Sequence, residues 1–234
     1  MRVYILAFIL SLIFSSFKSF AVEGYVITQQ IQTSMMGGGL IKKQKVYITE
    51  NFLITADDNG EVIQSIENGK FKIMRYDKIS KRYIDMTKMA PMIFTSLPFF
   101  SCTPAGCEMR KNVFRPTDEY KMFGKYKARK ILTTVSMFGI ASNIANWYTK
   151  DYKELVEAEK LRAKFFIKAI SAIKKEGTIK AFNVNTDELK KLFNKITNQY
   201  GGLIASQSNL MGGKSFMRVI SVEKKDIDLS DLRN

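Results

Sequence analysis

The sequence contains no histidine among its 234 residues. A chain without histidine has no Ser-His-Asp triad, no histidine general base and no histidine-ligated metal. Cysteine and proline are also scarce, at two and four residues, which excludes a multi-disulfide scaffold and a proline-rich low-complexity segment. The sequence also shows no phosphate-binding loop, nucleophile elbow or metal-ligand motif. We therefore expect a binding protein and not an enzyme, with no cofactor and no metal.

Long apolar runs are rare as well, and the main one lies at the N-terminus. Arg2 precedes an apolar run over residues 3–17, and small residues follow at Ser19 and Ala21. This order is typical of a secretory signal peptide that is cleaved after Ala21. An uncleaved membrane anchor is the alternative, but the run is shorter than the ~20 residues that span a bilayer. We expect a signal peptide over 1–21 and one exported, periplasmic domain over 22–234 that is not an integral membrane protein.

Acidic residues are few, with 22 Asp and Glu against 37 Lys and Arg, so the net charge is +15. Loss of Arg2 and Lys18 with the signal peptide would lower it to +13. The basic residues are scattered along the chain and form no single block. An exported protein has little access to nucleic acid, so we expect none as a partner. An anionic envelope surface, such as lipid headgroups, is the expected partner, and solubility alone is the other explanation.

Short β-type runs separated by turn residues fill residues 24–86. Asn68-Gly69 is a strong hairpin signal, and connections this short require antiparallel strands. Further strands are expected over 127–134, 135–140, 147–149, 203–208 and 215–222, with a loop over 97–116. Apolar residues then recur every three or four positions over 151–175, from Leu155 to Ile173, which predicts an amphipathic helix. A second helix is expected to begin after Asn185 and to stop at Gly201. The predicted class is α+β, with helices over one face of a curved antiparallel sheet.

Two sulfur-containing groups have alternative explanations. Cys102 and Cys107 enclose Thr-Pro-Ala-Gly, and a local disulfide is the natural expectation in an oxidising compartment, with a redox-active pair as the alternative. Met86, Met89 and Met92 stand three residues apart, and their thioethers are the soft ligands that Cu(I) prefers. Gap-filling apolar packing explains the same methionine spacing.

Seven segments share patterns of residue type with a known family, at residues 24–30, 44–53, 68–77, 81–86, 124–131, 146–151 and 218–228. These segments resemble exported proteins related to the outer-membrane lipoprotein carrier (the LolA/LolB-like superfamily), and in particular an uncharacterised branch of it. The resemblance implies an unclosed β-barrel, meaning a strongly curved antiparallel sheet with two or more helices covering its concave side. It also implies an apolar concave face of the kind that holds acyl chains in the carriers.

We therefore expect an exported, non-enzymatic cell-envelope protein that binds a lipid or a lipoprotein acyl chain in an apolar cleft. Docking of another envelope protein is the alternative, and methionine-based Cu(I) binding is a second one. The expected lining combines residues from strands with residues from the first helix. These are Ile27, Phe71, Ile73, Trp147, Leu161, Phe165 and Phe166.

Overall fold

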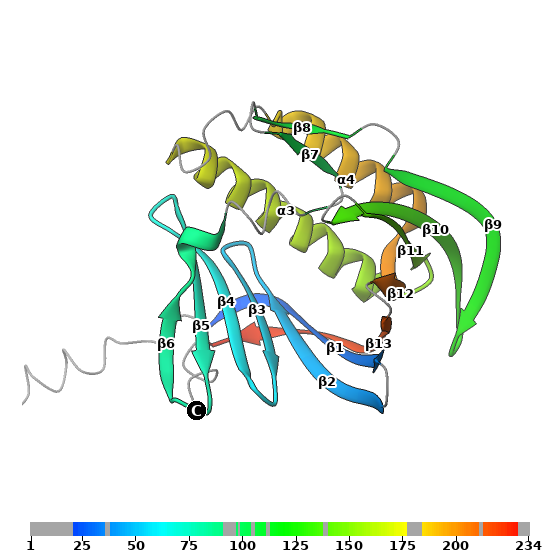
Figure 1. Cartoon of the computed structure of the whole chain (residues 1–234), viewed down its shortest axis with the longest axis horizontal. Coiled ribbons are helices and arrows are strands. Elements are labelled where there is room, and N and C mark those ends of the chain that lie inside the picture. The colour runs from blue at the N-terminus through cyan, green and yellow to red at the C-terminus, as the bar shows by residue number, and fades with distance from the viewer. Residues whose placement is uncertain are drawn as a thin grey trace, which may run out of the picture.

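The computed structural model describes residues 21–35, 38–90, 97, 99–103, 106–110, 113–137, 140–176, 184–210 and 213–228. Eleven antiparallel strands form one sheet, in the order β6-β5-β4-β3-β2-β1-β13-β12-β11-β10-β9. The first and last strands pair side by side in the middle of this sheet, where Val22 faces Ile227 and Ser34 faces Lys214. The sheet bends strongly and its edge strands β6 and β9 do not meet, so it is an open barrel (Figure 1).

The strands of the large sheet are β1 (Val22–Met35), β2 (Gly38–Ile48), β3 (Phe52–Asp57), β4 (Gly60–Glu67), β5 (Lys70–Asp77), β6 (Arg82–Asp85), β9 (Phe114–Phe123), β10 (Tyr126–Met137), β11 (Ile140–Thr149), β12 (Gly202–Leu210) and β13 (Gly213–Ile227). A separate hairpin pairs β7 (Phe100–Thr103) with β8 (Gly106–Met109). The helices are the short 3₁₀ helix η1 (Thr87–Met89), α3 (Lys153–Lys175) and α4 (Thr186–Tyr200).

Local sequence explains where these elements turn and end. Asn68 and Gly69 both have positive φ, 51° and 75°, as a type I′ turn requires, and they join β4 to β5. The Oδ1 atom of Asn185 accepts hydrogen bonds from the backbone N–H groups of Asp187 and Glu188, at 2.9 and 3.4 Å, and so caps α4. Gly201 follows α4 with φ at 91°, a value that favours glycine. The predicted start and stop of this helix are confirmed.

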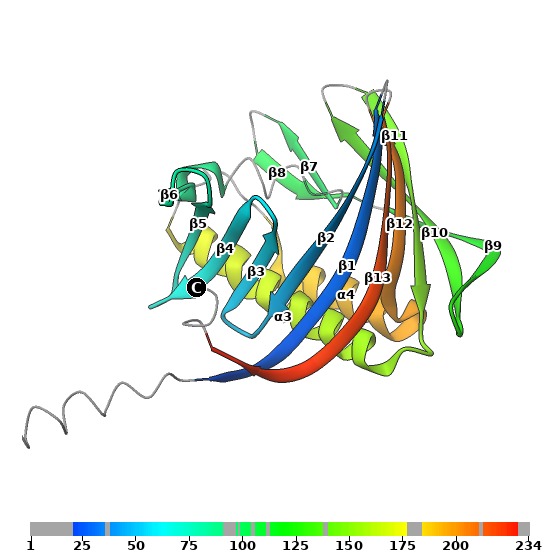
Figure 2. The same ribbon diagram turned by 90° about the horizontal axis from the view of Figure 1, so that it is seen from below.

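Helix α3 crosses the concave side of the sheet, and α4 packs beside it (Figure 2). The α3 side chains of Leu155, Phe165 and Ile173 are fully or almost fully buried against the sheet core. From the strands, Ile27, Phe71 and Ile73 belong to the same core. The burial of apolar side chains is the main force that holds a helix on such a sheet. It contributes ~25 cal/mol for each Å² of apolar surface removed from water. The predicted fold class, a strongly curved open antiparallel sheet with helices covering its concave face, is confirmed.

The segment expected as a loop over 97–116 differs from that expectation. It contains the β7–β8 hairpin and the first residues of β9, an edge strand that the sequence pattern did not suggest. The sequence of β9 does not alternate clearly between apolar and polar residues, because most of the strand is exposed. Arg115, Pro116, Tyr120 and Met122 are all exposed, and only Phe123 of this strand is buried. The two short strands expected at 127–134 and 135–140 are instead one strand, β10, followed by β11.

The predicted signal peptide lies outside the described residues except for Ala21. Across the residues that the structure describes, neither helix combines the length and apolarity needed to cross a bilayer.

Candidate functional site

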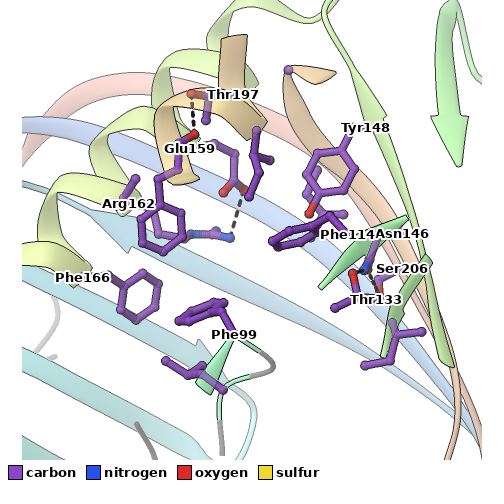
Figure 3. Close-up of a pocket in the computed structure, with 17 residues that line it drawn as sticks. Phe99, Phe114, Thr133, Asn146, Tyr148, Glu159, Arg162, Phe166, Thr197 and Ser206 are labelled. Atoms are coloured by element: carbon purple, nitrogen blue, oxygen red, sulfur yellow. Dashed lines mark hydrogen bonds and ion pairs between the residues drawn. The ribbon is translucent and has the colours of Figure 1, made fainter. Parts of the chain in front are cut away.

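A cavity of about 270 Å³ lies between the helices and the β9–β12 part of the sheet (Figure 3). Its size is near the lower end of the ~300–1,000 Å³ that small-molecule sites usually have, enough for one slender ligand. Most of its lining is apolar. The lining residues are Leu97, Phe99, Phe114, Thr133, Ile144, Asn146, Tyr148, Glu159, Arg162, Ala163, Phe166, Phe193, Ile196, Thr197, Gly201, Leu203 and Ser206.

Helix α3 supplies one wall of the cavity through a single face. Glu159, Arg162, Ala163 and Phe166 follow the 3–4 residue spacing that places side chains on one side of a helix. The neighbouring Phe165 points elsewhere and is fully buried in the sheet core. The cavity-lining residues and Phe165 thus belong to the same buried side of α3, but Phe165 is packed in the core while Glu159, Arg162, Ala163 and Phe166 border open space.

Aromatic rings close the cavity from the other elements. Phe99 precedes β7, Phe114 begins β9 and Phe193 comes from α4. The Phe99 and Phe193 rings meet edge to face with centroids 5.5 Å apart. Such a pair packs favourably beyond its buried area, so these two rings fix α4 against the segment before β7.

The sheet wall carries a chain of polar side chains on three adjacent strands. Asn146 of β11 donates from Nδ2 to Thr133 Oγ1 of β10 at 2.9 Å, and Ser206 of β12 donates from Oγ to Asn146 Oδ1 at 2.7 Å (Figure 3). Thr133 and Asn146 are buried. Because the three side chains satisfy one another, this wall stays polar without leaving Asn146 unpaired in the interior.

An ion pair lies on the helix wall. Arg162 Nη1 and Glu159 Oε1 are 2.9 Å apart, and the side chains are only 21% and 15% exposed. Burial raises the pKa of Glu159 above its usual value, and the positive charge of Arg162 opposes that shift. Burial also raises the pKa of Tyr148, with the Glu159 charge adding to the effect, so this phenol stays protonated at neutral pH.

The structure places the seven expected lining residues in two groups. Phe166 lines the cavity. Ile27, Phe71, Ile73 and Phe165 are at most 1% exposed in the core, Trp147 is buried at 8%, and Leu161 is half-buried against the same core. The role of these seven as ligand contacts stays a prediction, and six of them lie outside the cavity lining.

Most of the cavity residues did not stand out in the sequence. One usable signal was present: Glu159 and Arg162 fall four and seven positions after Leu155, within the helix stripe that also contains Phe166. Charged side chains inside an apolar helix stripe are unusual and mark a place where the helix does not face a simple core. Phe99 and Phe114 carried no such signal, because they come from a segment without a clear period.

Both cysteines and two of the three methionines singled out in the sequence lie within the described residues. Cys102 and Cys107 are opposite each other in the β7–β8 register, and no cysteine within the described part of the chain is free. The predicted disulfide is compatible with this placement and stays a prediction. Met86 immediately precedes η1 and Met89 is the last residue of η1, whereas Met92 lies outside the described residues. The described ranges hold no cluster of three or more Cys, Asp or Glu side chains suited to a metal.

Comparisons with solved structures give weak likenesses. The chain resembles PNGF-II with a TM-score of 0.40 and 16% identity, over 91% of this chain and 30% of that one, so it corresponds to less than a third of that protein's length. It also resembles a LolA superfamily protein from Nitrosomonas europaea, with a TM-score of 0.33 and 5% identity over 91% of each chain. A structure of the superfamily that the sequence resembles is thus among the similar ones.

A bacterial relative is similar in sequence over nearly the whole chain. The chain matches no protein-family model. It is 39% identical over 220 residues to an uncharacterised protein of Aquifex aeolicus (strain VF5), an alignment that covers 94% of this chain and 82% of the other. Identity at this level over nearly the whole chain shows common descent and a shared fold. The chain therefore belongs to the same family as this uncharacterised Aquifex aeolicus protein.

Proposed function

We propose that this protein is a non-enzymatic, exported envelope protein that holds a hydrophobic ligand, such as a lipid or an acyl chain, in the cavity between α3, α4 and strands β9–β12. The carrying observation is the cavity itself: a space of about 270 Å³ with a mostly apolar lining that includes Phe99, Phe114 and Phe193. An apolar space of this kind favours an apolar occupant over water.

The polar side chains of the cavity support binding rather than catalysis. Asn146 is engaged with Thr133 and Ser206, and the carboxylate of Glu159 is engaged with Arg162. A general base needs a free acceptor at the reacting atom, whereas these groups are already held by neighbours. The complete lack of histidine removes the commonest alternative base. The cavity thus combines apolar volume with a few fixed polar positions, as a binding site does.

Ligand binding is tested with the full-length chain and the fluorescent apolar probe N-phenyl-1-naphthylamine, followed by displacement with medium-chain esters. We expect one saturable site per chain. Ala163 lines the cavity and is 8% exposed, so Ala163→Trp fills the space and lowers probe affinity at least tenfold. Ala163→Leu gives a smaller loss and covers the case in which the tryptophan variant does not fold.

Lys164→Trp is the matched control, because Lys164 is the next residue on α3 and its side chain is 65% exposed. This variant should bind the probe like the wild type. The proposal is overturned if the folded wild-type chain binds no apolar probe, or if both variants at position 163 bind it undiminished.

We also propose that an anionic membrane surface is a partner. On the β9–β10 hairpin, Tyr120 and Met122 are 54% and 57% exposed. Lys127 lies opposite Met122 and Arg129 opposite Tyr120 in the strand register, and the Lys127 Nζ atom is 4.8 Å from the centroid of the Tyr120 ring. We name these four residues the hairpin patch. Basic groups beside exposed aromatic and apolar side chains suit a headgroup layer of negative charge.

A further inference from the structure

The ion pair on α3 is unusual because it lies inside an otherwise mostly apolar cavity. Burying two charges costs several kcal/mol per ion before their attraction is counted, and a pair of well-packed apolar residues is often as stable. Three other charge pairs of α3 involve exposed side chains: Glu157 with Lys160, and Glu50 with Lys164 and Lys168. Stability alone therefore gives little reason for Glu159 and Arg162 to occupy this wall.

The pair gives the cavity hydrogen-bond donors without net charge. A guanidinium group has five N–H donors, and Arg162 uses Nη1 toward Glu159. Its Nε–H is buried and has no hydrogen-bond partner among the described groups. Figure 3 shows the guanidinium group between the rings of Phe114 and Phe166, with Phe99 nearby. The charge of Arg162 is already matched by Glu159, while its donor capacity is not.

These two facts distinguish between classes of amphiphile. A lone arginine in an apolar cavity would select a carboxylate, since charge-assisted hydrogen bonds are about twice as strong as neutral ones. With Glu159 in place, a second carboxylate would lie close to the first in a site of low dielectric, which disfavours its charged form. Tyr148, the other titratable group of the lining, stays protonated and supplies no compensating positive charge. An uncharged carbonyl oxygen accepts from Arg162 without that repulsion.

We propose that Glu159 is a specificity-determining residue: by neutralising Arg162 it makes the cavity accept amphiphiles with an uncharged carbonyl, such as an acyl ester, and reject carboxylates of the same chain length. This inference rests on the proposed function, because it specifies which hydrophobic ligands the same cavity takes. The substitution Glu159→Gln tests it directly, since it removes the negative charge and keeps an oxygen that accepts from Arg162.

The experiment measures displacement of N-phenyl-1-naphthylamine by methyl decanoate and by decanoate at pH 7.5. The wild-type chain should bind methyl decanoate at least tenfold more tightly than decanoate. In Glu159→Gln the decanoate affinity should rise at least tenfold, while the methyl decanoate affinity stays within threefold. In the double variant Glu159→Gln/Arg162→Gln the probe should still bind and the gain for decanoate should disappear.

Glu157→Gln is the matched control, because Glu157 pairs with Lys160 at the same i,i+3 spacing on α3 but at the exposed surface. It should leave both affinities unchanged. The inference is overturned if the wild type shows no preference, if Glu159→Gln leaves the ratio unaltered, or if Glu157→Gln alters it equally. Failure of the proposed function has a different signature, since then the folded wild type binds neither ligand nor probe.

Discussion

Single residues control the close approaches in this fold, and Gly201 is the tightest case among the glycines that the structure describes. It lies between α4 and β12 with φ at 91°, and a Cβ atom built on it would lie only 2.0 Å from the backbone oxygen of Thr149. Gly69 also has a positive φ, at 75°, but a Cβ there meets nothing within 4 Å. A substitution at Gly69 therefore measures the cost of the backbone conformation alone, whereas a substitution at Gly201 adds the cost of a backbone clash.

We predict that Gly69→Ala lowers the free energy of unfolding by about 1–2 kcal/mol, the usual cost of a left-handed residue with a side chain. Gly201→Ala should cost more than ~4 kcal/mol, because the backbone of Thr149 must also move. Urea titration of both variants measures the difference, with soluble yield as the measure if Gly201→Ala does not fold. Equal losses at the two positions would contradict the clash.

At the scale of elements, the sequence predicted the helices from their apolar period and caps. It did not predict the exposed edge strand β9 or the β7–β8 hairpin. The apolar period of α3 and the Asn185 cap are local features, and a few neighbouring residues determine them. Strand β9 and the β7–β8 hairpin depend on partners found elsewhere in the chain: β9 is a strand because it pairs with β10. Most side chains of β9 are exposed, so its sequence has no clear alternation.

We predict that Asn185→Ala destabilises the protein by about 1 kcal/mol, because the backbone N–H groups of Asp187 and Glu188 lose their acceptor. Asn185→Asp keeps an acceptor oxygen at the start of α4 and should cost much less. Urea unfolding measures both variants, and Asn198→Ala, at an exposed position in the same helix, is the control. Equal stability of the alanine and aspartate variants would show that the cap contributes nothing.

At the scale of the whole molecule, the net charge of +15 has two explanations that the structure now makes distinguishable. If the charge serves solubility alone, any exposed lysine is equivalent. If it serves contact with an anionic surface, lysines beside exposed aromatic side chains contribute most, and the hairpin patch is the place to look. Lys225 of β13 provides the comparison, since it is exposed and its strand is separated from β9 by β10, β11 and β12.

We predict that the full-length chain co-floats with vesicles of phosphatidylcholine containing phosphatidylglycerol, and that 0.5 M salt releases it. Lys127→Glu should weaken this binding more than tenfold, at roughly 1 kcal/mol for each charge near the surface. Lys225→Glu changes the net charge equally and should have little effect. Equal weakening by both variants would mean that only the net charge matters, and no binding by the wild type would exclude the membrane as a partner.

The sequence by itself determined the class of fold, because alternation, helical period, caps and glycine turns act over a few residues. It also indicated the buried stripe of α3, from Leu155 to Ile173. Phe71, Ile73 and Phe165, which the sequence suggested as cleft lining, lie in the main core. Only the tertiary structure decided where a cavity remains. Its lining runs from Leu97 to Ser206, and these residues meet only because α3 packs its apolar stripe on one half of the curved sheet and leaves the other half to α4 and the segment before β7. Elements far apart in the chain pack together and so decide which space is filled and which stays open. Local sequence patterns do not predict such long-range packing.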